Sequence, residues 1–173
     1  MIDMPPPVAA ASALRLAMYQ PDQPQNTGAM LRLCACLGLG LDIIEPCGFV
    51  WDDAKLKRVA MDYRVLADPV RHRSWEDFTV QTGGRRIILL TTRGVAHYAH
   101  FAYRRGDILL LGRESAGVPD AVHQATHARI TIPMASGARS LNVVMAAAIA
   151  AGEALRQTIP VIPGHAPGCV FKI

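Results

Sequence analysis

A segment near the C-terminal end limits the fold more than any other part of the chain, because it reads as a strand, a loop and a helix in succession. Residues 130–134 alternate β-branched and polar groups as a short strand does, up to Pro133. Residues 135–139 have the composition of a loop, and Ser140 stands in the position of an N-cap before the alanine-rich run 143–152. This order of elements points free backbone N–H groups to the edge of a sheet, where a ligand can lie.

The segment carries neither of the two common phosphate-binding patterns. Its spacing differs from the dinucleotide fingerprint G-x-G-x-x-G, and it has no P-loop lysine. From these residues alone two interpretations stay open, a ligand-binding loop and an ordinary connection between a strand and a helix.

Strand and helix patterns alternate along the rest of the chain. The runs 86–91 and 107–111 are continuously apolar, which is typical of strands in a parallel sheet, and further strands are predicted at 14–19 and 41–45. A first helix is predicted after the turn 20–28 and ends at Gly38 and Gly40; its apolar face carries Met30, Leu33, Cys34 and Leu37. A short basic helix is predicted after Asp52 or Asp53, and two more helices are predicted at 94–103 and 119–125.

This alternation predicts a single α/β domain with a mostly parallel sheet and helices on both faces. Ligands of such sheets bind beyond the carboxyl ends of the strands. The loops expected there are 20–28, 91–94, 112–119 and 135–141.

Composition adds expectations about location and partners. Of 173 residues, 51% are hydrophobic and 18% are charged, which favours a protomer that buries surface against a second copy. No apolar run is long enough to cross a bilayer and the first residues do not resemble a signal peptide, so we expect a cytoplasmic protein. The net charge of +4 is compatible with a polyanionic partner. The cysteine and histidine spacings indicate no metal site.

Three ordered motifs resemble the SPOUT superfamily of methyltransferases, in its SpoU-like 2′-O-ribose branch. They are N-T-G-A-M-L-R at 26–32, L-L-G-R-E-S-A-G-V-P at 110–119 and the set I-P-M…R-S-L-N within 132–142. Flanking passages, including I-I-E-P-C-G-F at 43–49, narrow the resemblance to the tRNA wobble-nucleotide 2′-O-methyltransferases of the TrmL type. The likeness covers residues 14–157, which leaves 1–13 as a flexible leader and 158–173 as a tail.

The resemblance implies a homodimer with a deep C-terminal trefoil knot that binds S-adenosylmethionine, releases S-adenosylhomocysteine and acts on the tRNA anticodon stem-loop. It implies 2′-O-methylation of a wobble cytidine or modified uridine. By family position, the cofactor residues are Leu90, Gly112, Ile132, Met134, Ser140 and Leu141. The polar residues of the reacting centre are, by the same resemblance, Asn26, Arg32, Glu114, Ser140 and Asn142.

The chemistry of these residue types leaves several roles open. A guanidinium resists acting as a base, so we expect Arg32 to hold the target phosphate while the proton passes to a phosphate oxygen or to water. The other interpretation of Arg32 is a solvated helix residue. Glu114 would orient Arg32 or Asn26, or be a surface carboxylate. Ser140 and Asn142 would cap a helix as well as contact substrate.

Basic residues near aromatic ones are candidates for RNA contact, although each set is also compatible with plain surface. They are Lys55 and Arg58 near Trp51, Arg71 and Arg73 near Trp75, and Arg104 and Arg105 near Tyr103. The chain departs from the commoner family pattern at Gln20, where an acidic residue is frequent, and at Arg113, where proline often stands. Alternative functions are 2′-O-methylation of another tRNA or rRNA position, and a non-catalytic RNA-binding dimer.

Overall fold

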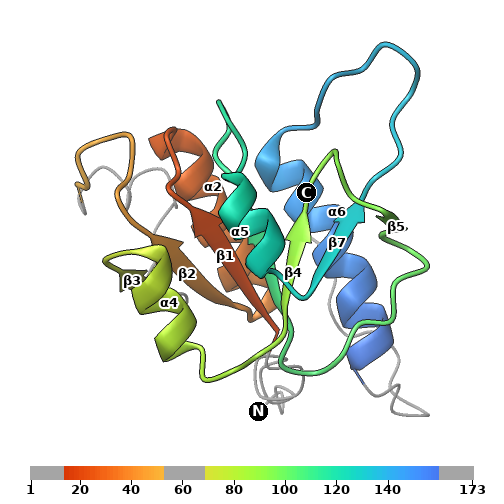
Figure 1. Ribbon diagram of the computed structural model, residues 1–173, viewed down its shortest axis with the longest axis horizontal. Helices are drawn as coiled ribbons and strands as arrows, with labels where there is room; N and C mark the ends of the chain where they lie inside the picture. Colours follow the sequence, from red (N-terminus) through yellow and green to blue (C-terminus); the bar gives the residue numbers. More distant parts are fainter. Residues whose placement is uncertain (1–13, 53–68, 160–173) are drawn as a thin grey trace, which may run out of the picture.

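A computed structural model describes residues 14–52 and 69–159, and within them a seven-stranded sheet forms the centre of the molecule (Figure 1). The strands lie in the order β3-β2-β1-β6-β4-β7-β5, and all the pairs are parallel. Their bounds are β1 Arg15–Tyr19, β2 Gly40–Ile44, β3 Val70–His72, β4 Ile87–Leu90, β5 Ala96–His97, β6 Ile108–Leu111 and β7 Ala128–Thr131. The predicted α/β class with a parallel sheet is confirmed.

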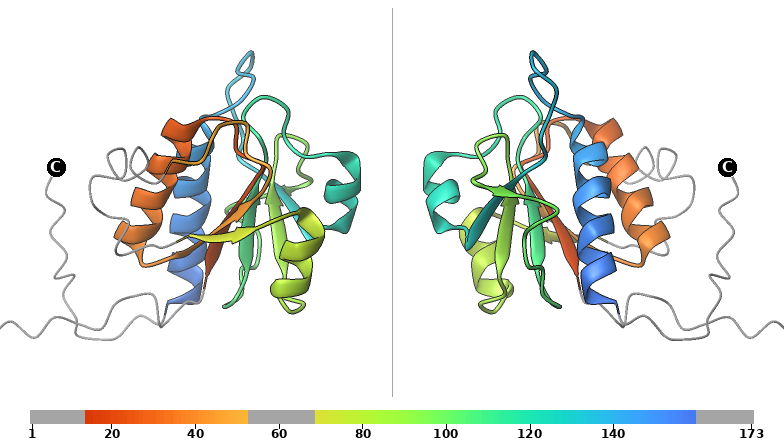
Figure 2. Two further views of the ribbon diagram at one scale, coloured as in Figure 1. Left: turned by 90° about the vertical axis from the view of Figure 1, so that its left-hand side faces the viewer. Right: turned by 90° about the vertical axis from the view of Figure 1, so that its right-hand side faces the viewer.

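Helices cover both faces of the sheet, as the sequence predicted. Figure 2 shows α2 (Pro24–Leu37) and α6 (Val143–Thr158) side by side on one face. The shorter helices α4 (Trp75–Gln81) and α5 (Asp120–Ala125) lie on the other. The continuously apolar strands β4 and β6 are buried because helices pack against them from both sides.

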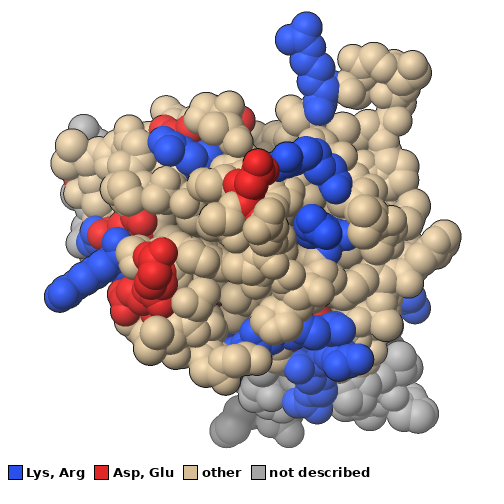
Figure 3. Space-filling model, viewed as in Figure 1, with Lys and Arg blue, Asp and Glu red and all other residues tan. Residues whose placement is uncertain are grey.

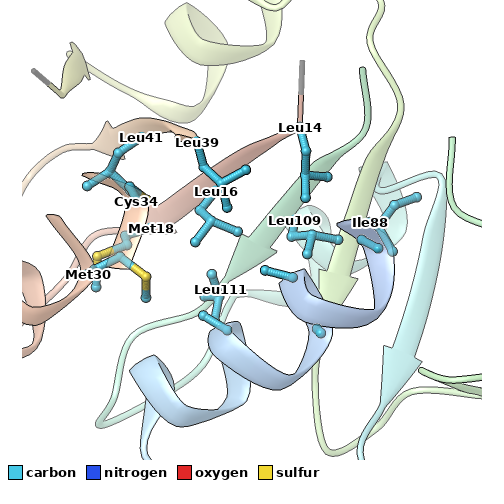
Figure 4. Packing of buried hydrophobic residues seen from close by; sticks show 14 of the residues in the cluster. Leu14, Leu16, Met18, Met30, Cys34, Leu39, Leu41, Ile88, Leu109 and Leu111 are labelled. Atoms are coloured by element: carbon cyan, nitrogen blue, oxygen red, sulfur yellow. The ribbon is translucent and has the colours of Figure 1, made fainter. Parts of the chain in front are cut away.

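The larger core layer lies between the sheet and the α2–α6 pair (Figure 4). Leucines and Met18 of the strands face Met30 and Cys34 of α2 there. Helix α6 contributes mainly alanines to this layer. Four of them are fully buried, Ala147, Ala150, Ala151 and Ala154. Because alanine has only a methyl group, the α6 backbone lies close to the sheet.

Helix α2 begins earlier than the sequence suggested. Pro24 occupies the start of the helix, where a missing N–H has no cost, and residues predicted as a turn up to 28 are therefore partly helical. Asn26 lies in the first turn and does not precede the helix. The predicted end is confirmed, since Gly38 has a φ of 65° and Leu39 donates to the carbonyl of Cys34 at 2.8 Å.

The strand, loop and helix near the C-terminal end exist with shifted boundaries. The strand predicted at 130–134 is β7, which ends at Thr131, and the helix continues beyond 152 to Thr158. The predicted N-cap at Ser140 is wrong. Asn142 caps α6, because its Oδ1 accepts from the N–H groups of Val144 at 2.9 Å and of Met145 at 3.3 Å.

The helix predicted at 94–103 is also wrong. Residues Ala96–His97 form β5, an edge strand in which Ala96 pairs with Ile130, and the N–H of Tyr98 donates to the carbonyl of Thr131 at 3.0 Å. The open edge of β7 offers backbone partners that hold this segment extended. The sequence reading also missed β3 and α4, although Ser74 accepts from the N–H of Asp77 as a helix N-cap does.

Some expectations fall outside these observations. The leader 1–13, the short helix expected to carry Lys55 and Arg58, and the tail beyond 159 lie outside the described residues. The trefoil knot and the domain boundaries stay predictions. Among the described residues, no helix is both long and apolar enough to span a membrane. The same residues contain no cluster of three side chains suited to hold a metal ion.

Candidate active site

A cavity of about 400 Å³ lies at the carboxyl ends of β4, β6 and β7, the edge where the sequence predicted a ligand. Five segments of the chain form its walls. The lining residues are Gln23 and Asn26, then 89–92, then 111–114 with Gly117 and Val118, then Thr131, Ile132, Met134, and finally 140–143 with Ala146. The cavity therefore collects the ends of strands that are distant in sequence.

The six residues assigned to the cofactor by resemblance all line this cavity. Leu90 ends β4, Gly112 follows β6, and Ile132 and Met134 follow β7. Ser140 and Leu141 come from the loop before α6, which stands away from the body of the molecule in Figure 1. These residues bring apolar side chains and backbone groups at strand ends to one cavity.

Gly112 has a strict steric reason to be glycine. A Cβ on Gly112 would lie 2.6 Å from the carbonyl carbon and 2.7 Å from the Cα of Gly117. The contact arises because Arg113 and Gly117 exchange two backbone hydrogen bonds of 2.9 Å, which fold residues 113–117 into a tight hairpin over the strand end. We refer to residues 113–117 as the 113–117 hairpin. It carries Glu114 to the cavity wall.

Three polar residues of the predicted reacting centre form one hydrogen-bonded chain. The Nδ2 of Asn142 donates to the Oδ1 of Asn26 at 3.1 Å, and the Nδ2 of Asn26 donates to the Oε1 of Glu114 at 3.1 Å. The Oε1 of Glu114 accepts in this contact because an amide nitrogen can only donate, so Glu114 orients the Asn26 amide with its nitrogen toward the hairpin. The structure thus brings together α2, the hairpin and the start of α6. Glu114 contacts Asn26, one of the two partners considered from the sequence.

Glu114 lies beside a second carboxyl group, that of Asp22. The N–H of Asp22 donates to the Oε2 of Glu114 at 3.2 Å. Burial and the hydrogen bond to Asp22 raise the pKa of Glu114 above its ordinary value. The pKa of Asp22 is lowered to about 2, chiefly by the hydrogen bond with the Glu114 side chain and further by Ser115 and Arg113. The pair therefore favours a proton on Glu114 and a charge on Asp22.

The two departures from the family pattern meet beside this pair. The Nη1 of Arg113 donates to the Oε1 of Gln20 at 3.4 Å, and the Nε of Arg113 lies 3.9 Å from the Oδ2 of Asp22. Sequence reasoning did not single out Asp22, nor the lining residues Gln23, Thr91 and Thr92. The signals for them were their places in the loops 20–28 and 91–94, expected at the carboxyl ends of strands, and, for Thr91 and Thr92, a flanking passage at 90–92 that shares the family resemblance.

Arg32 is the one predicted site residue that does not line the cavity. It is exposed on α2, six residues beyond Asn26 and so about 9 Å further along the helix axis. The other nine residues named by resemblance line the cavity: Asn26, Leu90, Gly112, Glu114, Ile132, Met134, Ser140, Leu141 and Asn142.

The candidate RNA-binding arginines are dispersed. Arg71 lies 4.7 Å from the ring centroid of Trp51 and donates to Glu45 at 2.6 Å, so its aromatic neighbour is Trp51 and not the expected Trp75. Arg104 and Arg105 are exposed just before β6, at the end of the sheet opposite the cavity. Figure 3 shows basic side chains gathered along that lower rim. None of these arginines is part of the cavity wall.

Comparison with known proteins gives this arrangement a context. The model of the SpoU rRNA Methylase family matches residues 13–152. A protein of Ancylobacter novellus named tRNA (cytidine(34)-2′-O)-methyltransferase is 52% identical over 147 residues, which cover 84% of this chain and 93% of the relative. A protein of the same name from Escherichia coli is 38% identical over 161 residues, covering 92% and 99%.

Solved structures agree with the sequence relatives. A structure described under "Structural insights into the 2-OH methylation of C/U34 on tRNA" superposes with a TM-score of 0.79 at 40% identity, covering 83% of this chain and 95% of the other. The SpoU methyltransferase AviRb from Streptomyces viridochromogenes, solved in complex with AdoMet, superposes with a TM-score of 0.75 at 26% identity, covering 85% and 61%.

Proposed function

The chain belongs to the SpoU rRNA methylase family, and from this membership we propose that it transfers a methyl group from S-adenosylmethionine to the ribose 2′-hydroxyl of the wobble nucleotide of tRNA. The observation that carries the proposal is the single cavity lined by the whole cofactor set and by four of the five polar residues. The relatives named tRNA (cytidine(34)-2′-O)-methyltransferase support the choice of substrate.

The residues of the cavity fit S-adenosylmethionine. A volume of about 400 Å³ suits a ligand of that size, and a side chain at position 112 would collide with the hairpin that bounds the slot. Leu90, Ile132 and Met134 offer apolar contacts and backbone groups for the adenosyl portion. When bound, S-adenosylmethionine supplies an electrophilic methyl group on a sulfonium.

We assign the polar residues to orientation and charge. Asn26, held between Glu114 and Asn142, gives the polar wall of the cavity a fixed shape against which the ribose is oriented. Ser140 lies at the exposed mouth of the cavity, where it contacts either partner of the reaction. Arg32 lies outside the cavity, so we place it on the substrate side, where its guanidinium holds an RNA phosphate and stabilises charge that develops on the 2′-oxygen.

We further propose that the protein is a homodimer with a face on α6. Met145 and Ile149 lie on one face of α6 and Leu141 directly precedes its N-cap, and their side chains are 63%, 39% and 39% exposed, which is unusual for large apolar residues that lie close together. Leu141 also lines the cavity. A second copy over this stripe would border the site. Because the proposed substrate is the anticodon stem-loop of tRNA, we place the protein in the cytoplasm.

The proposal is tested with purified protein, S-adenosylmethionine carrying a labelled methyl group, and tRNA. The expected product is a single 2′-O-methyl group at nucleotide 34, and tRNA with 2′-deoxyribose at that nucleotide should accept none. Methyl transfer to a different nucleotide, or to rRNA, would show that the proposed substrate is wrong while the proposed reaction is right. Tight RNA binding without any transfer would contradict catalysis altogether.

A further inference from the structure

The loop between β1 and α2 meets the 113–117 hairpin at one residue, Asp22. The N–H of Asp22 donates to Glu114, and the N–H of Ser115 donates back to the Oδ2 of Asp22 at 3.3 Å. The Ser115 hydroxyl donates to the same oxygen. Two successive residues of the hairpin are therefore tied to one residue that is 92 and 93 positions away in sequence, Glu114 to its backbone N–H and Ser115 to its carboxylate.

A third segment, at Gly48, also packs closely against Asp22. Gly48 donates its N–H to the carbonyl of Pro21 at 2.9 Å, and a Cβ on Gly48 would lie 2.7 Å from the Cβ of Asp22. A side chain at position 48 would push Asp22 away from its place. The close approach of these two backbones fixes where the carboxylate stands relative to Glu114.

A proton shared by the two carboxyl groups would supply the donor that a buried oxygen of Asp22 lacks. The Oδ1 of Asp22 is buried, and while both groups are ionised it has no hydrogen-bond donor among the described residues. The carboxyl groups of Asp22 and Glu114 lie within hydrogen-bonding distance, so a proton on Glu114 supplies that donor. The neighbouring groups are Gln23 at the N-cap of α2, Asn26 in its first turn, Gly48 on its loop, and Ser115 and the charged Arg113 on the hairpin.

We infer that Asp22 is a positioning residue of the methyl-transfer site, which keeps Glu114 protonated and in place so that its Oε1 orients the amide of Asn26. The inference rests on the proposed function. Asp22 itself is not part of the cavity wall. Its effect reaches the reacting centre through Glu114 and then Asn26, whose Oδ1 in turn receives the hydrogen bond of Asn142.

Asp22→Asn tests this with little change of shape. The Oδ1 of the new amide can accept from Ser115, while its nitrogen donates to Glu114 and favours the ionised carboxylate. The titration of Glu114, followed by NMR of ¹³C-labelled glutamate carboxyls, should move to lower pH by about one unit. The kcat at neutral pH should fall about tenfold or more, while the affinity for S-adenosylmethionine should stay within about twofold of the wild type.

Two further variants separate protonation from simple anchoring. Ser115→Ala removes one hairpin contact and keeps both carboxyl groups, so the Glu114 titration should stay high. Asp120→Asn makes the same substitution at an aspartate whose side chain is 80% exposed, and it should leave both titration and turnover unchanged. An unshifted Glu114 titration in Asp22→Asn overturns the inference, as does an equal shift in Ser115→Ala.

The same measurements keep this inference apart from the proposed function. If wild-type protein transfers no methyl group to tRNA, the proposed function fails, while the Glu114 titration still decides whether Asp22 holds the proton on Glu114. If wild-type protein is active and Asp22→Asn turns over at the wild-type rate, the proposed function stands and the role of Asp22 is wrong.

Discussion

Asn142 donates a hydrogen bond of 3.1 Å to Asn26 across 116 positions of sequence, and with its other side-chain atom it caps α6. One amide therefore joins the beginnings of the two helices that share a face of the sheet. The Oδ1 of Asn142 stabilises the start of α6, and its Nδ2 holds Asn26 in the candidate active site. This division allows the two roles of Asn142 to be separated by mutation.

Asn142→Asp should keep the cap and lose the contact with Asn26, because an aspartate accepts from the helix N–H groups but cannot donate. We expect unchanged thermal stability and a fall in kcat of about tenfold or more. Asn142→Ala should show the same fall together with a loss of about 1 kcal/mol in the free energy of unfolding. Similar kcat values for Asn142→Asp and wild type would show that the contact is not needed.

Gly112→Ala should abolish cofactor binding, since the added methyl group would lie 2.6 Å from the backbone of Gly117 and open the 113–117 hairpin. The matched control is Gly152→Ala on α6, where a Cβ meets nothing within 4 Å. That change should stabilise the protein by about 0.5–1 kcal/mol through helix propensity. Isothermal titration with S-adenosylmethionine and denaturant unfolding measure the two effects.

Arg32→Ala should reduce kcat on tRNA by about 100-fold or more while S-adenosylmethionine affinity stays within about twofold, because Arg32 lies outside the cavity wall. Arg32→Lys should recover part of the activity, since a point charge still attracts phosphate but lacks the planar fork of guanidinium. Equal losses of turnover and of cofactor affinity in Arg32→Ala would contradict the role assigned to it.

Met145→Glu should dissociate the proposed homodimer, because it places a charge in the middle of the apolar stripe on α6. Val80→Glu is the control, as Val80 is 79% exposed on α4, on the opposite face of the sheet. Sedimentation velocity should give a dimer for wild type and Val80→Glu and a monomer for Met145→Glu. A monomeric wild type would remove the dimer from the proposal.

His123 should make stability depend on pH below neutrality. Burial lowers the pKa of His123 beneath its ordinary value of 6.5, with Arg93 and Arg129 adding to the effect and Asp120 opposing it. The native state therefore binds a proton less readily than the unfolded chain. The contribution of neutral His123 to the free energy of unfolding is therefore fully present above pH 6.5 and is lost as the pH falls below that value. His123→Gln should flatten the fall in unfolding free energy between about pH 7 and 5; an unchanged slope would contradict this.

The strands of the core were predictable because short, continuously apolar runs such as those of β4 and β6 are typical of strands buried on both faces of a parallel sheet. The structure of segment 94–103 was not predictable, because its extended conformation depends on pairing with the edge of β7, and no local sequence pattern reveals that partner. Ser140 was mistaken for the N-cap because both Ser140 and Asn142 favour that position, and only the backbone geometry distinguishes them.

The site was predictable to the extent that the motifs resemble a family. From residue types alone, two roles remained possible for Glu114, a group that orients a neighbouring side chain and a surface carboxylate. Asp22 escaped notice because the contacts that mark it, chiefly those with residues 114 and 115, join positions far apart in sequence. Such long-range pairs are set by the fold and leave no periodic trace in one sequence.

The alanine face of α6 has a consequence for variation in this chain. Ala147, Ala150, Ala151 and Ala154 have no exposed surface, so an extra methylene at any of them would lift the helix as a rigid rod and carry Asn142 with it. A substitution that never meets cofactor or RNA would then be scored as a catalytic defect in an activity screen. Tolerance to mutation in this enzyme should thus be governed by side-chain volume along a buried helix as much as by chemistry at the cavity.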